Sequence, residues 1–326
     1  MKDKVLISFG SYNSPHFLEH FVSAFERYDP GYDCDLLIWN HSSTNTLQLK
    51  LLDKYSKKYN IQNRSNLGRA QGSYQASWEY TKDYKYYFFL HDDSGFIRDN
   101  WLKFAVSRIE DNSIEKEIEG LGLDNLPVGK VGYQGYEWQN KYKYLRTGYR
   151  TIFHYMDGLA DLLKIKIPEY YQHIGDDRVL YKNELLQKMD RICSIEDFRQ
   201  IKDTSLFKDI VSFFDNLGLI NSDPFAPNDI YGSTYHTFQT VSEFLNDIAP
   251  MRFGYRTHII DGPGYCQEEL GFNSFWGNKF ISHYGDHVVF KRLSSILKIH
   301  EDEVRNRYKD KTFLNIVDNI IRREVL

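Results

Sequence analysis

Residues 87–94 read YFFLHDDS, an apolar run that stops abruptly at a histidine and two aspartates. Apolar, aromatic-rich runs of this length are typical of a buried strand. Open α/β sheets bind their ligands in the crevice outside the carboxyl ends of the strands. Carboxylates at such an end are hard oxygen donors that suit Mg²⁺ or Mn²⁺. The run therefore predicts an α/β fold and metal-assisted chemistry on a phosphorylated substrate.

The first third of the chain alternates between strand-like and helix-like segments. Strands are expected at residues 5–9, 35–40, 59–62 and 84–90, and amphipathic helices at 15–25, 43–55, 72–83 and from 101 onward. Ser14, followed by Pro15, and Ser43 are placed to cap the first two helices. Strands that alternate with helices imply βαβ units and a mostly parallel sheet with helices on its faces.

The rest of the chain divides by pattern into further parts. Residues 149–251 show few clear strands and several helical patterns, which indicates a helical insertion into the α/β part at 1–148. Strand character returns at 258–260 and 280–282, so residues 252–300 are expected to complete the core. A charged helical pattern fills residues 301–326. With 326 residues, the chain can bury a sizeable core.

Composition narrows the classes of function. The net charge of −4 argues against a nucleic-acid binder that works by neutralising phosphates. The three cysteines, Cys34, Cys193 and Cys266, show no CxxC spacing, which fits a reduced cytoplasmic protein. No secretory signal pattern precedes the first strand, and no apolar stretch approaches the roughly 20 residues that span a bilayer. A membrane-bound substrate would be met from the membrane surface.

Two more stretches join the 87–94 run in a family resemblance. Ser11-Tyr12-Asn13 follows the first strand, and Asn66-Leu67-Gly68-Arg69-Ala70 precedes the third helix. In order and spacing, the three stretches resemble the GT-A glycosyltransferases, particularly those of the family 2 type. The resemblance implies a nucleotide-sugar site at residues 1–148, an acceptor side at 149–251, and Mn²⁺ or Mg²⁺ as cofactor. It also implies that Ser11, Tyr12, Asn13, Asn66 and Arg69 bind the nucleotide-sugar.

The sequence departs from the family pattern at two positions. His91 stands where the family's aspartate-x-aspartate motif usually begins, and Asn40 stands where an aspartate usually follows the second strand. Asp93, at the third position of the motif, is therefore the expected metal ligand, with Asp92 as second choice. His91, Asp92 and Asn40 are expected to contact the nucleotide-sugar. The alternative for the aspartates is that they only cap the segment that follows.

Two later stretches extend the resemblance. Residues 264–271, GYCQEELG, resemble the acidic segment of inverting GT-A enzymes, which makes Glu269 the expected catalytic base and Glu268 its second choice. A carboxylate near the acceptor can take the proton of the attacking hydroxyl. These acids could instead begin an exposed helix. His283 stands where many GT-A enzymes place a histidine that closes the metal shell, although a histidine bonded within a turn would read the same way.

The resemblance implies a hexosyltransferase-like enzyme that moves a sugar, with a UDP-sugar favoured as donor, to a hydroxyl of a glycan or glycolipid with inversion. Polysaccharide biosynthesis in the cytoplasm is the expected setting. One alternative is a metal-dependent nucleotidyltransferase, but the loop FGSYNS at residues 9–14 lacks the basic residues that it would need. The other alternative is a degenerate sugar-binding protein without activity, because His91 replaces an acid.

Overall fold

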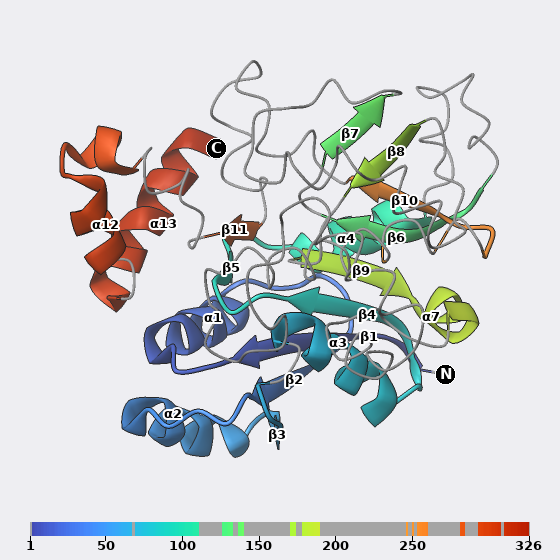
Figure 1. Ribbon diagram of the computed structural model, residues 1–326, viewed down its shortest axis with the longest axis horizontal. Helices are drawn as coiled ribbons and strands as arrows, with labels where there is room; N and C mark the ends of the chain where they lie inside the picture. The colour runs from blue at the N-terminus through green and yellow to red at the C-terminus, as the bar shows by residue number, and fades with distance from the viewer. Residues whose placement is uncertain are drawn as a thin grey trace, which may run out of the picture.

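The computed structural model describes residues 2–66, 69–110, 126–132, 136–139, 170–173, 178–189, 246, 250, 253–259, 281–283, 293–307 and 310–325. Its centre is a seven-stranded sheet in the order β10-β6-β9-β4-β1-β2-β3 (Figure 1). The strands are β1 (Lys2–Ser11), β2 (Cys34–Asn40), β3 (Asn60–Asn63), β4 (Tyr84–Leu90), β6 (Val128–Gly132), β9 (Arg178–Lys182) and β10 (Arg256–Ile259).

Six of these strands run parallel to one another. The pairs β1–β2, β1–β4, β2–β3 and β10–β6 are parallel, whereas β9 lies antiparallel between β4 and β6. Two small sheets pair β5 (Ser94–Phe96) with β11 (Ile281–His283), and β7 (Tyr136–Gln139) with β8 (Tyr170–His173). This is the mostly parallel α/β sheet flanked by helices that the sequence predicts.

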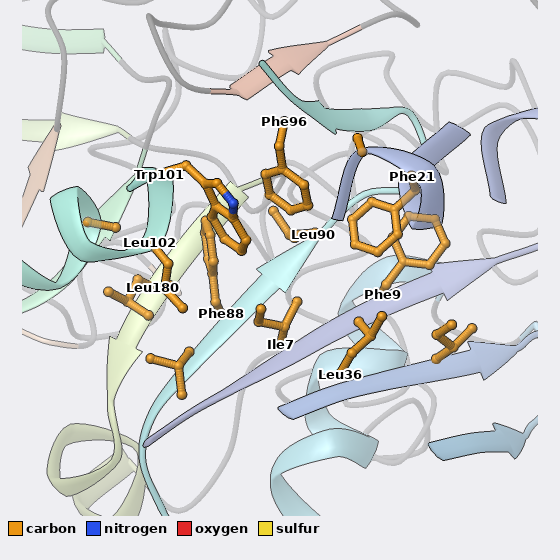
Figure 2. Close-up of a cluster of buried hydrophobic side chains, with 14 of the residues drawn as sticks. Ile7, Phe9, Phe21, Leu36, Phe88, Leu90, Phe96, Trp101, Leu102 and Leu180 are labelled. Atoms are coloured by element: carbon orange, nitrogen blue, oxygen red, sulfur yellow. The ribbon is translucent and has the colours of Figure 1, made fainter. Parts of the chain in front are cut away.

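Alternating side chains of the strands feed two apolar layers, one on each face of the sheet. On one face, α1 (Pro15–Arg27), α2 (Thr46–Ser56) and α4 (Trp101–Glu110) cover the side chains of Ile7, Leu36, Phe88 and Leu180. Figure 2 shows this layer, in which the rings of Phe9 and Phe21 stack with centroids 3.8 Å apart. On the other face, α3 (Arg69–Tyr80) and α7 (Asn183–Met189) pack through Tyr74, Trp78 and Leu185.

The C-terminal helices add a third apolar cluster. Val304 of α12 (Glu301–Arg307) and Phe313, Leu314 and Val317 of α13 (Lys311–Val325) pack with Phe17 of α1, and with Ile97 and Leu293. In Figure 1 these red helices lie beside α1 and β5. Within the described part of the chain, no helix combines the length and apolarity that a membrane crossing requires.

Three expectations differ from the structure in detail. Ser14 occupies the N-cap position of α1, but its side chain makes no capping hydrogen bond. The cap of α2 is Asn45, not Ser43: the Asn45 side chain accepts from the backbone N–H groups of Leu47 and Gln48. Residues 178–182, which the sequence placed in the helical insertion, form β9 inside the central sheet. Most of residues 149–251 lie outside the described part, so the division into four parts stays a prediction.

Candidate functional site

The carboxyl ends of the parallel strands bring the predicted site residues to one edge of the sheet. Ser11, the last residue of β1, pairs with Asn40, the last residue of β2. Asn40 in turn pairs with Asn63, and Phe9 of β1 pairs with Leu90, the last residue of β4. Segments that lie far apart in the sequence therefore meet at the edge where α/β sheets bind ligands.

His91, Asp92 and Asp93, here called the His-Asp-Asp cluster, follow β4 directly. Their potential ligand atoms all lie within 4.8 Å of one another, and each residue is half-buried. His91 Nδ1 lies 3.9 Å from Asp93 Oδ1. The turn that gathers them is held by a hydrogen bond from the backbone N–H of Ser94 to the carbonyl of His91, at 3.2 Å. The structure therefore brings the three metal-competent side chains together, as the sequence predicts.

Two neighbouring carboxylates in a half-buried site repel each other. Burial raises the pKa of Asp92 to about 6, and the charge of Asp93 adds to the rise. His91 and a hydrogen bond from Ser14 Oγ, at 2.9 Å from Asp92 Oδ2, act in the opposite direction on that pKa. A cation bound between the carboxylates would remove the repulsion, because a nearby positive charge favours the ionised form.

The donor atoms of the cluster suit a divalent ion. Two ligands that each lie about 2.1 Å from an octahedral ion are about 3.0 Å or about 4.2 Å apart. The separation of 3.9 Å between His91 Nδ1 and Asp93 Oδ1 lies between these two values. Two carboxylates with one imidazole form a donor set that Mn²⁺ accepts, whereas Mg²⁺ prefers the oxygens alone. The cluster therefore supplies the donor types of a metal site, and its atoms would have to move to coordinate an ion.

His283 reaches the cluster through strand pairing. In the β5–β11 pair, His283 lies opposite Ser94, the residue that follows Asp93. The backbone of a residue 190 positions after Asp93 is thus placed beside the metal-competent run, as a fourth metal ligand would require. This agreement concerns the backbone; the role of the imidazole as a ligand stays a prediction.

The loop after β1 uses its polar side chains inside the protein. Ser11, which is 1% exposed, accepts a hydrogen bond from Gln48 Nε2 at 2.5 Å. Asn13 has a positive φ of 49°. Its Oδ1 accepts from the backbone N–H groups of Thr44 and Asn45, at 2.8 and 2.9 Å. Asn13 thereby joins the loop after β1 to the loop after β2.

The loop after β2 is also internally bonded. Asn40 is 7% exposed, and its Nδ2 donates to Asn63 Oδ1 at 2.8 Å while its Oδ1 accepts from the backbone N–H of Ser43 at 3.0 Å. Both polar groups of Asn40 thus have protein partners. The name loop network is used here for four residues that hold these loops together: Ser11, Asn13, Asn40 and His41, which is described in the next paragraph. The predicted contact of Ser11, Asn13 and Asn40 with the nucleotide-sugar stays a prediction.

Sequence reasoning missed His41, which directly follows β2. His41 is 3% exposed and shares a hydrogen bond of 3.0 Å between its Nδ1 and Asn66 Oδ1. The pKa of His41 is lowered to about 4, mainly by burial and also by the charges of Arg64 and His91, while the hydrogen bond with Asn66 acts in the opposite direction. Gly10 makes room for the ring, since a Cβ there would lie 3.0 Å from His41 Nε2. A histidine one residue beyond a strand that ends at the site was the available signal.

The remaining predicted residues are described in part or not at all. Tyr12 is 46% exposed, so part of its side chain is accessible to a ligand. Arg69 begins α3, which gives the place of its backbone only. Glu268 and Glu269 lie outside the described residues, so their roles stay predictions.

Comparisons with known proteins find similar structures but no matching sequence family. No family model matches the chain, and no curated protein sequence matches it. S. aureus TarS is 13% identical with a TM-score of 0.36, over 57% of this chain and 30% of that one. A TarS structure with UDP-GlcNAc is 12% identical with a TM-score of 0.35, over 59% of this chain and 49% of that one. The chain therefore spans less than half of the length of these two structures.

Another similar structure is a mannosyltransferase. PcManGT from Pyrobaculum calidifontis, in complex with GDP-Man and Mn²⁺, is 10% identical with a TM-score of 0.39, over 100% of this chain and 73% of that one. All three TM-scores lie below 0.5.

Proposed function

We propose that this chain transfers a sugar from a nucleotide-sugar donor to a hydroxyl of a glycan or glycolipid acceptor, with a divalent metal ion at the His-Asp-Asp cluster. The observation that carries the proposal is the convergence of His91, Asp92 and Asp93 within 4.8 Å at the carboxyl end of β4. The β1 loop ends beside it, at the edge where α/β sheets bind nucleotides.

The residues of the cluster take distinct parts in this proposal. Asp93 and Asp92 hold the ion, with His91 and His283 as further ligands. A bound Mn²⁺ or Mg²⁺ supplies positive charge that stabilises the diphosphate leaving group. The exposed ring of Tyr12 offers a stacking surface to the base of the nucleotide.

The acceptor side of the reaction rests on sequence alone. Glu269, with Glu268 as second choice, takes the proton of the attacking hydroxyl, so that the sugar is displaced directly and with inversion. A UDP-sugar donor, a hexose as transferred sugar and Mn²⁺ as the ion follow from the family resemblance. A cytoplasmic setting in polysaccharide biosynthesis is proposed on the same ground.

The proposal is tested by the donor reaction of the full chain. Candidate nucleotide-sugars are incubated with Mn²⁺ and with EDTA, and release of nucleoside diphosphate is measured with and without acceptor. Donors are first selected by a thermal-shift screen against nucleoside diphosphates with Mn²⁺, because binding raises apparent stability by mass action. Metal-dependent release is expected. If no donor that binds releases nucleoside diphosphate, the chain is a binding protein without activity. If the nucleotide itself is transferred to the substrate, the chain is a nucleotidyltransferase.

Glu269→Gln tests the proposed base separately from the donor site. Nucleotide affinity should stay near the wild-type value, while transfer to the acceptor falls and the acidic limb of the rate–pH profile disappears. Equal losses of nucleotide affinity and transfer would assign Glu269 a structural role. Glu268→Gln is the matched control, with a smaller effect expected on transfer.

A further inference from the structure

Ser14 stands at the start of α1 but does not serve that helix as a cap. A serine at this position ordinarily accepts a hydrogen bond from an N–H group of the first turn. Here its backbone carbonyl accepts from the N–H of Leu18 at 3.0 Å, as in any helix, while its side chain makes no such bond. Ser14 Oγ donates instead to Asp92 Oδ2, at 2.9 Å. The hydroxyl is thus directed from the helix to the His-Asp-Asp cluster.

This hydrogen bond constrains the carboxylate of Asp92. An ionised carboxylate offers about four lone-pair sites on two oxygens. The Ser14 hydroxyl uses one of them on Oδ2, which limits rotation of the group and leaves further lone pairs for a cation. Asp92 also lies next to Asp93, and a donor on one of two neighbouring carboxylates stabilises its charge. Partners that hold a ligand carboxylate in this way tune metal affinity.

Ser14 is held on a rigid element. Phe21 of α1 stacks on Phe9 of β1, and Phe17 packs in the cluster formed with the C-terminal helices. Lys311 Nζ of α13 lies 2.9 Å from Glu19 Oε1 of α1. The N-terminal turn of α1 is therefore fixed from the sheet side and from the side of α13.

The other end of α1 is tied to the same segment that carries the cluster. The backbone N–H of Asp29 donates to Asp99 Oδ1 at 2.8 Å, and the backbone N–H of Asn100 donates to the carbonyl of Asp29 at 2.7 Å. Asp99 and Asn100 follow β5, a few residues after Asp93. Together with the Ser14–Asp92 bond, these contacts fasten α1 to residues 92–100 at both of its ends.

We propose that Ser14 is a positioning residue for the metal site: its hydroxyl holds the Asp92 carboxylate in the orientation that binds the ion. The inference rests on the proposed function, because it needs the His-Asp-Asp cluster to bind a metal. It adds a residue that neither the aspartate run nor the helix-start pattern indicates, since a serine before a proline reads as a helix cap.

The test measures Mn²⁺ affinity of the full chain without substrate, by electron paramagnetic resonance of the free ion. Ser14→Ala should weaken binding about 10-fold or more, the range for partners of metal ligands. Ser14→Thr keeps the hydroxyl and should stay within about 2-fold of wild type. The matched control is Ser23→Ala on the same helix, whose hydroxyl donates at 2.6 Å to the carbonyl of Glu19 and should not affect affinity.

The outcomes separate the two proposals. Mn²⁺ binding by wild type and Ser14→Ala with equal affinity overturns the role of Ser14 and leaves the metal site standing. Absence of Mn²⁺ binding by wild type overturns both. If Ser14→Ala does not fold, the pair Ser14→Thr and Ser14→Val decides, since it differs in the hydroxyl at nearly equal volume: equal affinities overturn the proposal, and weaker binding by the valine variant supports it.

Discussion

The loop network after β1 and β2 and the His-Asp-Asp cluster after β4 lie at the same edge of one sheet but use their side chains differently. In the loop network, Ser11, Asn13 and Asn40 hydrogen-bond to protein groups that surround them. In the cluster, three side chains that can bind a cation turn toward one point. A polar residue after a strand can therefore join neighbouring loops or gather with other cation-competent side chains at the sheet edge.

The two regions are expected to have opposite effects on the stability of the folded protein. In the loop network, amide and hydroxyl side chains form hydrogen bonds with buried protein groups, and these bonds stabilise the loops. Two adjacent carboxylates repel each other while no cation is bound, and this repulsion adds to burial, which is the main cause of the raised pKa of Asp92. We therefore expect variants of the cluster to lose function and keep stability, and variants of the loop network to lose stability first.

The largest effect is expected for Asp93→Asn. Turnover should fall by roughly 100-fold or more, the scale of losing one preorganised charge at a reaction centre. The free energy of unfolding without metal should stay the same or rise, because one of two repelling charges is removed. Turnover at saturating Mn²⁺ and urea denaturation measure the two quantities.

Asp53→Asn on α2, an exposed position remote from the sheet edge, is the control and should change neither quantity. Turnover near the wild-type value in Asp93→Asn would show that Asp93 is not part of the site. It would also contradict the expectation that variants of the cluster lose function.

The second effect is an opposite pH dependence of stability in the two regions. His41 has a folded pKa of about 4 against an ordinary value of 6.5, so only the unfolded chain binds its proton between these values. Its contribution to stability is lost as the pH falls from about 6.5 to about 4. Asp92 has a folded pKa of about 6 against 3.8, so its contribution is lost as the pH rises through that window. Each group contributes up to about 1.4 kcal/mol per pH unit.

Urea denaturation in EDTA between pH 4 and pH 6 separates the two groups. Relative to wild type, His41→Asn should become less stable as the pH rises, because only Asp92 then titrates. Asp92→Asn should become less stable as the pH falls. A wild-type slope in either variant would show that the substituted residue does not titrate in this window.

The third effect concerns the stability of the loop network. Asn40→Ala removes the acceptor of the Ser43 N–H and the donor to Asn63. A buried donor that loses its partner costs about 1–3 kcal/mol, so we expect a loss of about 2 kcal/mol in the free energy of unfolding. Mn²⁺ affinity should not change. A larger loss of Mn²⁺ affinity than of stability would place Asn40 in the site chemistry instead.

The smallest effect is expected for Tyr12, which lies in the loop after β1 and has an exposed side chain. Tyr12→Ala should weaken nucleoside diphosphate binding about 10-fold, the lower range for loss of a base-stacking ring. Tyr12→Phe should bind nearly as wild type, and the melting temperature without ligand should be unchanged in both variants. Isothermal titration calorimetry measures the affinities; equal binding by Tyr12→Ala would exclude stacking on this ring.

Much of the fold follows from local patterns. The apolar runs at 5–9, 35–40 and 84–90 became β1, β2 and β4, since alternation and apolar runs report burial directly. β9 escaped prediction because its five residues, RVLYK, are short and lie in a helix-rich stretch. Its place between β4 and β6 depends on pairing with strands that are distant in the sequence, and local propensity carries no information on such pairing.

The candidate site shows the same division. Residue types and their places after strands were enough to predict a metal-competent run at His91, Asp92 and Asp93. The sequence could not indicate that Ser14 donates to Asp92, because the two residues are 78 positions apart and Ser14 reads locally as a helix cap. Nor could it indicate that the side chain of Asn40 donates to Asn63, because Asn63 lies on another strand.

What the sequence by itself determined is the set of elements and the chemistry available after each strand, since these depend on the neighbouring residues along the chain. What only the tertiary structure decided is which distant groups face one another: Ser14 and Asp92, the loop network, and the pairing of His283 with Ser94. The physical reason is that hydrogen bonds and charge interactions act over a few ångströms in space. Strand order and register determine these distances, and they arise from contacts between segments that the chain brings together only when it folds.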